Sequence, residues 1–222
     1  MRLNKYIAQA TGMSRRTADN VIAAGRVMLN GHIATTGQEV RDNDKVKLDN
    51  QTLDFVEKST TIMLNKPMGY ICSRDGQGGQ TIYNLLPTNL HRLKPVGRLD
   101  KNSSGLLLLT NDGQLAFELT HPKFHKTKKY TIATNKPVSP LHQRLISDDG
   151  IILSDGLSKL QLERINHTDN TNWQITMTEG RNRQIRRTFQ ALGYDVVKLH
   201  RTNFGQYRLG TLTSGKYVDA SN

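Results

Sequence analysis

The chain has 222 residues, enough for a small domain and a larger one, and 36% of them are hydrophobic, which suffices for a buried core. Its 31 Lys and Arg residues outnumber 19 Asp and Glu residues, and the net charge of +12 favours a polyanionic partner, nucleic acid before an anionic membrane surface. No apolar run approaches the roughly 20 residues of a spanning helix, and no signal peptide opens the chain. A single cysteine, Cys72, excludes an internal disulfide and a cysteine metal cluster. We therefore expect a reduced, cytoplasmic protein.

Two short helices are expected at the start of a compact unit over residues 1–58. Gly12 ends the first helix, and Ser14 is a good N-cap for the second, over residues 15–25. In both segments apolar residues recur at helical spacing: Leu3, Tyr6, Ile7 and Ala10 in the first, Ala18, Val21 and Ile22 in the second.

Short strands are expected to complete this unit. The stretch "RVMLNGHIA" (26–34) predicts a β-hairpin that turns at Asn30-Gly31. The stretch "KVKLD" (45–49) alternates like a further strand. A module of about 50 residues with two helices and a few strands follows from these patterns.

Arginines open the second helix, where positive charge opposes the helix dipole. Arg15 and Arg16 each cost roughly 0.3–1 kcal/mol there when exposed. Two interpretations stay open: the arginines are simply solvated, or their guanidiniums and the free backbone N–H groups meet phosphates. In the second interpretation Lys5 and Arg26 extend the same surface.

A polar stretch, "LDFVEKSTT" (53–61), predicts a linker to a second domain over residues 59–222. Short runs rich in β-branched and apolar residues alternate there with helical candidates near 112–120, 138–147 and 182–192. This pattern predicts the α+β class, with a mixed, mainly antiparallel sheet and flanking helices. The expected strands are "TIMLNKP", "LLLLTN", "KYTIAT", "KLQLERI" and "WQITMTEG".

Most of the positive charge belongs to the second domain. Residues 1–58 carry nine basic and seven acidic side chains, a net of +2, whereas residues 59–222 carry 22 and 12, a net of +10. The larger domain therefore supplies most of the attraction for a polyanion and is no passive appendage.

Several motifs for other chemistries are incomplete. The glycine-rich "DGQGGQT" (75–81) lacks the Gly-Lys-Ser/Thr ending of a phosphate-binding loop, and a mobile loop is expected instead. His121 and His125 are four residues apart, but Pro122 and the lack of a nearby carboxylate argue against a zinc-binding helix. We therefore expect no metal site.

The stretch "GRLDKNSSGLLLLTNDG" (97–113) places one carboxylate, Asp100, before the most apolar segment of the chain. By itself Asp100 could be a turn or cap residue. Its surroundings favour function: Arg98 and Lys101 supply positive charge, and the buried-looking strand 106–109 would hold the carboxylate rigidly.

A second basic cluster follows in "TEGRNRQIRRTFQALGY" (178–194), where four arginines fall within seven residues. A solvated basic helix face is one interpretation. The other is that the start of this helix points into a cleft, where an arginine keeps a carboxylate ionised and oriented. The four are Arg181, Arg183, Arg186 and Arg187.

In these motifs the chain resembles the RsuA-like family of ribosomal RNA pseudouridine synthases. Residues 1–58, with "SRR" at 14–16, resemble an S-four type RNA-binding domain, a small α/β fold. The matches in the second domain come in the family's order: "LNKPMGYICSRD" (64–75), "GRLDKNSSGLLLLTNDG", "KKYTI" (128–132), "EGRNRQIRR" (179–187) and "VVKLHR" (196–201).

The resemblance implies a site for isomerising a uridine that is flipped out of its stack. Asp100 falls at the catalytic aspartate, Tyr130 at the active-site tyrosine, and Arg186 at the arginine that pairs with the aspartate. Arg98, Leu99 and Leu199 fall in the substrate pocket. No cofactor is implied, since no electrons or groups are exchanged with a third molecule. The RNA-binding candidates are Lys5, Arg15, Arg16, Arg26, Arg181, Arg183 and Arg187.

Two classes of function remain. The first is a pseudouridine synthase, acting as a monomer on ribosomal RNA, with large-subunit RNA preferred and small-subunit RNA as the alternative. The second is a non-catalytic RNA-binding factor of ribosome assembly. The joint presence of Asp100, Tyr130 and Arg186 favours the enzyme.

Overall fold

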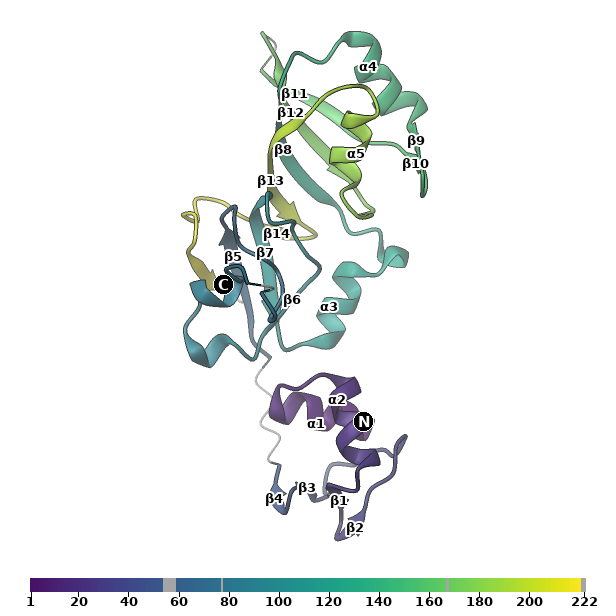
Figure 1. Cartoon of the computed structure of the whole chain (residues 1–222), viewed down its shortest axis with the longest axis vertical. Coiled ribbons are helices and arrows are strands. Elements are labelled where there is room, and N and C mark those ends of the chain that lie inside the picture. Colours follow the sequence, from purple (N-terminus) through teal and green to yellow (C-terminus); the bar gives the residue numbers. More distant parts are fainter. Residues whose placement is uncertain (54–58, 77, 167, 221–222) are drawn as a thin grey trace. The chain divides into compact units, whose positions relative to one another are not determined.

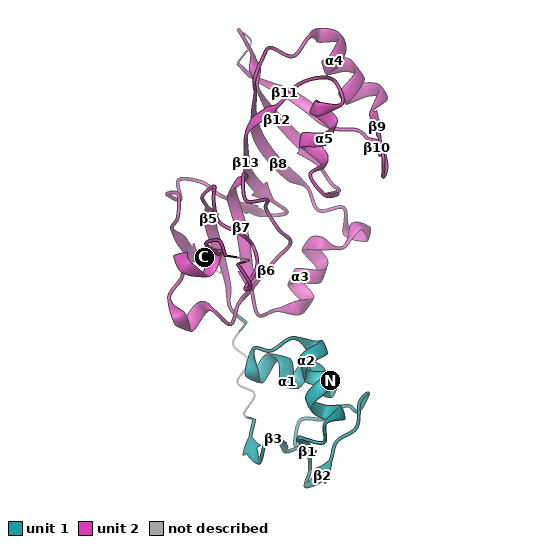
Figure 2. Cartoon of the chain, viewed as in Figure 1, with its two compact units in different colours: residues 1–59 teal, residues 60–222 magenta. Residues whose placement is uncertain are grey.

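The computed structural model describes residues 1–53, 59–76, 78–166 and 168–220. The chain forms two compact units, residues 1–59 and 60–222 (Figure 1, Figure 2). Residues 54–58 of the expected linker, and residue 77 of the glycine-rich stretch, lie outside the described residues.

The smaller unit packs two helices against a short sheet. Helix α1 (Leu3–Thr11) ends at Gly12, whose φ of 79° is left-handed, and α2 (Arg15–Ala23) begins after Ser14, whose side chain accepts from the Thr17 N–H at 3.0 Å. Both predicted helices are thus confirmed. The buried residues between helices and sheet include Leu3, Ile7, Ala18, Ile22, Val27 and Val46.

The sheet of this unit has the order β2-β1-β3-β4. Strands β1 (Val27–Leu29) and β2 (His32–Ile33) form the predicted hairpin, and β3 (Val46–Leu48) is the predicted further strand. Asn30 and Gly31 have φ values of 52° and 87°, the positive angles that a tight two-residue hairpin turn requires. Strand β4 (Gln51–Thr52) pairs with β3.

The larger unit is built on a sheet with the order β11-β12-β8-β13-β7-β5-β15. All neighbours on this path are antiparallel except β13 and β7, which are parallel. The prediction of a mixed, mainly antiparallel sheet is therefore confirmed. The strands are β5 (Thr61–Lys66), β7 (Ser104–Thr110), β8 (Lys128–Thr134), β11 (Gln161–Asn166), β12 (Asp169–Met177), β13 (Val196–Phe204) and β15 (Tyr217–Asp219); β6 (Lys94–Pro95) pairs with β7 and β14 (Tyr207–Arg208) with β13.

Helices flank this sheet at the three predicted places. They are α3 (Gly113–Thr120), α4 (Pro140–Arg144), which continues as a π-helical turn (Leu145–Asp149), and α5 (Gln184–Gln190). A separate hairpin, β9 (Ile151–Leu153) and β10 (Gly156–Ser158), lies beside α5 (Figure 1). Short 3-10 turns occur at Ile82–Leu85, Thr88–Leu90 and Pro122–Phe124.

Strand β7 is buried on both faces, which explains its four consecutive leucines. Leu107 and Leu109 belong to the core that contains Ile185 and Phe189 of α5. Leu106 and Leu108 belong to a second core with Leu119 of α3 and Phe204. A strand covered on both sides shows a continuous apolar run rather than an alternating one.

The centre of the sheet brings three chain segments into one row. Arg201 of β13 lies opposite Tyr130 of β8 and opposite Gly105 of β7. A Cβ atom on Gly105 would lie 2.2 Å from the Arg201 carbonyl oxygen, so only glycine permits this approach of the two strands. Arg201 is thereby fixed between Tyr130 of β8 and the start of β7.

Candidate active site

The turn from Asp100 to Ser103 is held by a buried lysine. The Lys66 ammonium donates to the carbonyl oxygens of Asp100 at 3.1 Å, of Ser103 at 2.8 Å and of Pro67 at 3.1 Å. Lys66 has no exposed surface, and its burial lowers the pKa of its ammonium, against the nearby charges of Cys72 and Asp100. The Lys66 side chain therefore gives three backbone carbonyl oxygens the hydrogen bonds that water would otherwise donate.

The two remaining carbonyl groups of the turn are also bonded. The Gly69 N–H donates to Lys101 O at 2.8 Å, and Arg186 Nη2 donates to Asn102 O at 2.7 Å. Arg186 Nη1 donates to Val196 O as well, so this guanidinium links the turn to β13. All four carbonyls from 100 to 103 accept hydrogen bonds, which makes the turn a rigid support for the Asp100 carboxylate.

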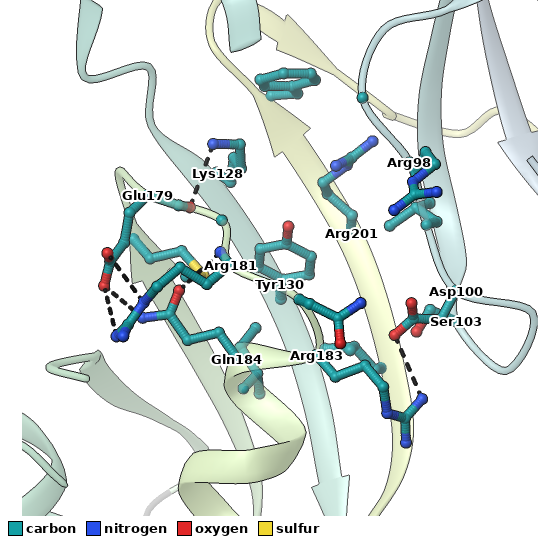
Figure 3. A pocket seen from close by; sticks show the side chains of 18 of the residues that line it. Arg98, Asp100, Ser103, Lys128, Tyr130, Glu179, Arg181, Arg183, Gln184 and Arg201 are labelled. Atoms are coloured by element: carbon teal, nitrogen blue, oxygen red, sulfur yellow. Dashed lines mark hydrogen bonds and ion pairs between the residues drawn. The ribbon is translucent and has the colours of Figure 1, made fainter. Parts of the chain in front are cut away.

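The Asp100 carboxylate forms an ion pair with Arg183, not with the arginine that the sequence indicated. Arg183 Nη1 lies 3.5 Å from Asp100 Oδ2, and both side chains are more than a third exposed (Figure 3). Arg183 precedes α5 with a left-handed φ of 45°. Arg186 lies a turn further on and uses its donors on the two carbonyl groups; burial, then the charge of Arg183, lowers its pKa, and Asp100 raises it.

A cavity of about 510 Å³ opens beside this carboxylate, within the usual size range of small-molecule sites. Its lining includes the expected Arg98, Leu99 and Leu199 together with Asp100 and Tyr130. Tyr130, which is 8% exposed, lies at the centre of the view in Figure 3, with Asp100 and Ser103 to one side. Arg186 does not line the cavity and acts on the turn from behind.

Two of the arginines assigned to RNA are used inside the protein. Arg181 donates to Asp155 Oδ1 at 3.0 Å and to Leu157 O at 2.8 Å, and Arg187 donates to Asp155 Oδ2 at 2.7 Å. Both therefore attach the β9–β10 hairpin to the start of α5. Each of these arginines therefore already has a carboxylate partner within the protein, and their assignment as RNA contacts stays a prediction.

The basic residues of the smaller unit differ in whether they already have partners within the protein. Arg26 is bidentate on Asp49, at 2.8 Å from Nε to Oδ1, and Arg15 donates to Asn4 Oδ1 at 3.2 and 3.3 Å. Lys5 and Arg16 are exposed on α1 and α2. Of the four expected RNA contacts in this unit, Arg26 is thus the one already neutralised by a carboxylate.

Three cations at the site escaped the sequence analysis as individual residues: Lys66, Lys128 and Arg201. Each belongs to a recognised motif but lies at its edge. A signal existed for Lys66, since a charged residue that ends a strand of otherwise buried positions has to be paired or functional. In β13 the polar residues Lys198, His200 and Thr202 leave few apolar positions, so this segment was recognised as a motif and not as a strand.

No group of three or more His, Cys, Asp or Glu side chains that could hold a metal ion occurs in the described part of the chain. His121 and His125 flank the 3-10 turn Pro122–Phe124 and are not on one helix. Among the described residues, no helix is long and apolar enough to cross a membrane. Cys72 is buried against the Leu99 backbone, and burial raises the pKa of its thiol.

This arrangement suits chemistry on a flat, neutral ring attached to a phosphate backbone. A fixed carboxylate can act as a nucleophile or a base. Tyr130 offers an aromatic face for stacking, and the apolar side chains of Leu99 and Leu199 exclude water beside it. Five cations among the lining residues favour a polyanionic substrate: Arg98, Lys128, Arg181, Arg183 and Arg201.

Comparison with known proteins gives consistent matches for both units. Residues 60–191 match the family described as RNA pseudouridylate synthase, and residues 1–46 match the S-four domain. The ribosomal small subunit pseudouridine synthase A of Pasteurella multocida is 36% identical over 100% of this chain and 96% of its own length. The ribosomal large subunit pseudouridine synthase B of Xanthomonas campestris is 37% identical over 94% of this chain, but the match spans only 44% of that longer protein.

The same similarity is present in three dimensions. A crystal structure of a pseudouridylate synthase superposes with a TM-score of 0.70 at 35% sequence identity, covering 99% of this chain and 95% of that one. The likeness therefore includes both units and the sheet that carries the cavity.

Proposed function

The chain belongs to the RNA pseudouridylate synthase family, and we propose that it isomerises one or a few uridines of ribosomal RNA to pseudouridine. Relatives named for the small and the large ribosomal subunit match with nearly equal identity, 36% and 37%. The preference for large-subunit RNA, predicted from the wording of the motifs, therefore stays a prediction, with small-subunit RNA as the alternative.

The observation that carries this proposal is the position of one carboxylate. Asp100 stands on a turn whose carbonyl groups are all bonded, at the edge of a cavity that also contains Tyr130. A reacting group held in place gains much of its rate from orientation, because little freedom is lost in the transition state. A carboxylate that only capped a strand would need none of this support.

The reaction exchanges no atoms with a third molecule. The bond between the anomeric carbon and the ring nitrogen breaks, the uracil turns, and a carbon–carbon bond forms to the same sugar. The proton displaced from the ring carbon is balanced by the proton that the freed nitrogen gains. Asp100 serves as the nucleophile or base for these steps, Tyr130 stacks on the extruded ring, and Leu199 closes the apolar side of the pocket.

The two arginines near Asp100 have separate roles in this proposal. Arg183 orients the carboxylate through the direct ion pair at 3.5 Å. Arg186 is a positioning residue, because it holds the Asn102 carbonyl and contributes positive charge from behind the turn. Arg98 adds a further positive charge to the wall of the cavity.

The smaller unit serves as an RNA-binding domain over residues 1–58, and residues 59–222 form the catalytic domain. The S-four match over residues 1–46 supports the first assignment, and the family match over 60–191 supports the second. We place the protein in the bacterial cytoplasm, where ribosomal RNA is made, and infer that it acts as a monomer without a cofactor.

Purified protein incubated with unmodified transcripts of both ribosomal RNAs tests this function. Pseudouridines are mapped by carbodiimide labelling and reverse-transcription stops. Asp100→Ala is expected to abolish the product while RNA affinity stays within a few-fold, because binding lies in the basic surface. Asp149→Ala, which removes an exposed carboxylate elsewhere, is the matched control.

Two results would redirect the proposal. Turnover by purified Asp100→Ala would remove that residue from its role. Tight binding of ribosomal RNA with no product on either transcript or on native rRNA precursors would favour the alternative of an RNA-binding assembly factor.

A further inference from the structure

We propose that Arg201 and Lys128 form a site, within the cavity, for a phosphate of the RNA backbone next to the target uridine. The proposal rests on the function stated above, since it assigns the position of the substrate's backbone. It rests equally on one buried cation, Arg201, and one half-buried cation, Lys128, that the isomerisation itself does not use.

Arg201 carries a donor that nothing in the described structure accepts. The residue is 2% exposed, its Nε donates to Leu106 O at 2.8 Å, and its Nη2 is buried without a hydrogen-bond partner. The guanidinium lines the cavity and lies between Tyr130 and Arg98 in Figure 3. A buried charged donor that is left unpaired is costly, and an anion bound in the cavity would offset that cost.

Lys128 places a second cation on the same side of the cavity. Its ammonium lies 5.4 Å from the centre of the Phe204 ring, and the Arg201 guanidinium lies 4.8 Å from that centre. Lys128 has only long hydrogen bonds, to the carbonyls of Glu179 at 3.3 Å and Thr178 at 3.5 Å. Burial, then the charge of Arg201, lowers the pKa of Lys128, with Glu179 opposing both.

The carboxylates of the cavity wall have other partners. Glu179 Oε1 accepts from Gln184, and Oε2 lies 3.5 Å from Arg181 Nε. Asp100 pairs with Arg183 on another part of the wall. Two cations that share one aromatic ring and lack a paired carboxylate of their own are stabilised when an anion binds between them.

A phosphodiester fits this site better than the uracil does. It brings a full negative charge and two free oxygen atoms, one for each cation, whereas a neutral ring oxygen offsets neither charge. Arg201 lies directly opposite Tyr130 in the sheet, and neighbouring strands are about 4.8 Å apart. A base stacked on Tyr130 would therefore have its own backbone within reach of Arg201 and Lys128.

Side-chain NMR of the ¹⁵N-labelled full-length protein tests the site without any turnover. Arg201→Lys identifies the Arg201 Nε–H signal, which the bond to Leu106 O should protect from exchange. Inorganic phosphate and uridine monophosphate are expected to shift that signal, and uridine is not. Lys128→Gln should weaken phosphate binding about tenfold, as expected when one charge-assisted hydrogen bond is removed. Lys129→Gln, on the opposite face of β8, should change it less than twofold.

An unshifted Arg201 signal at saturating phosphate, or equal effects of Lys128→Gln and Lys129→Gln, would overturn the proposal. The unmodified protein is assayed on ribosomal RNA transcripts in parallel. Product formation without phosphate binding would reject this site and leave the proposed function intact. Phosphate binding without product would support the anion site as a property of the cavity and reject the synthase function.

Discussion

Lys66 shows how one side chain can determine the geometry of a site that it does not enter. Its ammonium is completely buried, and its three acceptors include both ends of the turn that carries Asp100. A methionine would retain the length of the stem and remove all three donors. The carbonyl groups would then be buried without partners, and the turn would lose its support.

Lys66→Met is therefore expected to lower the free energy of unfolding by about 3 kcal/mol, the cost of breaking a buried, charged network. It should also reduce kcat by about 100-fold with a KM within a few-fold, because the misplaced carboxylate acts on a substrate that still binds. Urea unfolding and steady-state assays measure the two effects. Lys159→Met, at an exposed position, is the control; a kcat unchanged by Lys66→Met would separate this residue from the active site.

Two adjacent arginines of α5, Arg186 and Arg187, differ in whether they support the turn that carries Asp100. Arg186→Ala removes a donor from the Asn102 carbonyl and positive charge from behind Asp100, whereas Arg187→Ala removes one hydrogen bond to an exposed Asp155. We expect kcat to fall at least about tenfold in the first variant and less than about twofold in the second. Equal losses in single-turnover assays would show that the wrong arginine has been assigned.

For single residues, the sequence predicted which side chains belong to the site better than it predicted the contacts between them. The motifs placed Asp100, Tyr130 and Leu199, and the structure brings all three to one cavity. The partner of the carboxylate could not be predicted in the same way, because the left-handed backbone at Arg183 sets which arginine reaches it. The resemblance of the motif to the family pointed instead to Arg186.

Among the elements, the hairpin β9–β10 depends on side chains from outside it. Arg181 and Arg187 both bond Asp155, at its tip, and Arg181 also bonds the carbonyl groups of Gly156 and Leu157. The hairpin has three residues in each strand, and Ile152 and Leu157 are exposed, so its own packing is small. A two-stranded hairpin of this size is at best marginally stable by itself.

Asp155→Asn should therefore loosen this hairpin selectively. Because the carboxylate is 40% exposed, we expect a loss of at most about 1 kcal/mol in the free energy of unfolding. Amide hydrogen exchange of residues 151–158 should nevertheless become about tenfold faster, while β7 and β13 stay protected. Uniform acceleration over the whole sheet would contradict a local role for the two arginines.

The strands show why some elements were predicted and others were not. The leucines of β7 and the β-branched residues of β8 are strong signals, since β7 is buried along nearly its whole length and β8 alternates between buried and partly exposed positions. Strand β13 was recognised only as a motif, because Lys198, His200 and Thr202 interrupt its apolar positions. Its pairing with β7 and β8 joins segments about 70 to 100 residues apart, which no local pattern encodes.

For the whole molecule, the smaller unit supplies little of the net charge but a distinct set of exposed cations. Arg15→Ala combined with Arg16→Ala should weaken RNA binding and reduce the slope of log affinity against log salt by about 0.7–0.9 for each phosphate that is no longer neutralised. Fluorescence anisotropy with a labelled rRNA fragment at several salt concentrations measures both. Arg26→Ala should have a smaller effect, because Asp49 already neutralises Arg26; an unchanged slope in the double variant would mean that Arg15 and Arg16 are merely solvated.

The most direct test of the central claim is pseudouridine mapping across total ribosomal RNA from cells with and without the gene. We expect at least one site to disappear on deletion, to return with the unmodified gene, and not to return with Asp100→Ala. That result would establish the enzyme, its substrate and its catalytic carboxylate together. Ribosomal RNA with an identical set of pseudouridines in both strains, or a site restored by Asp100→Ala, would contradict the claim.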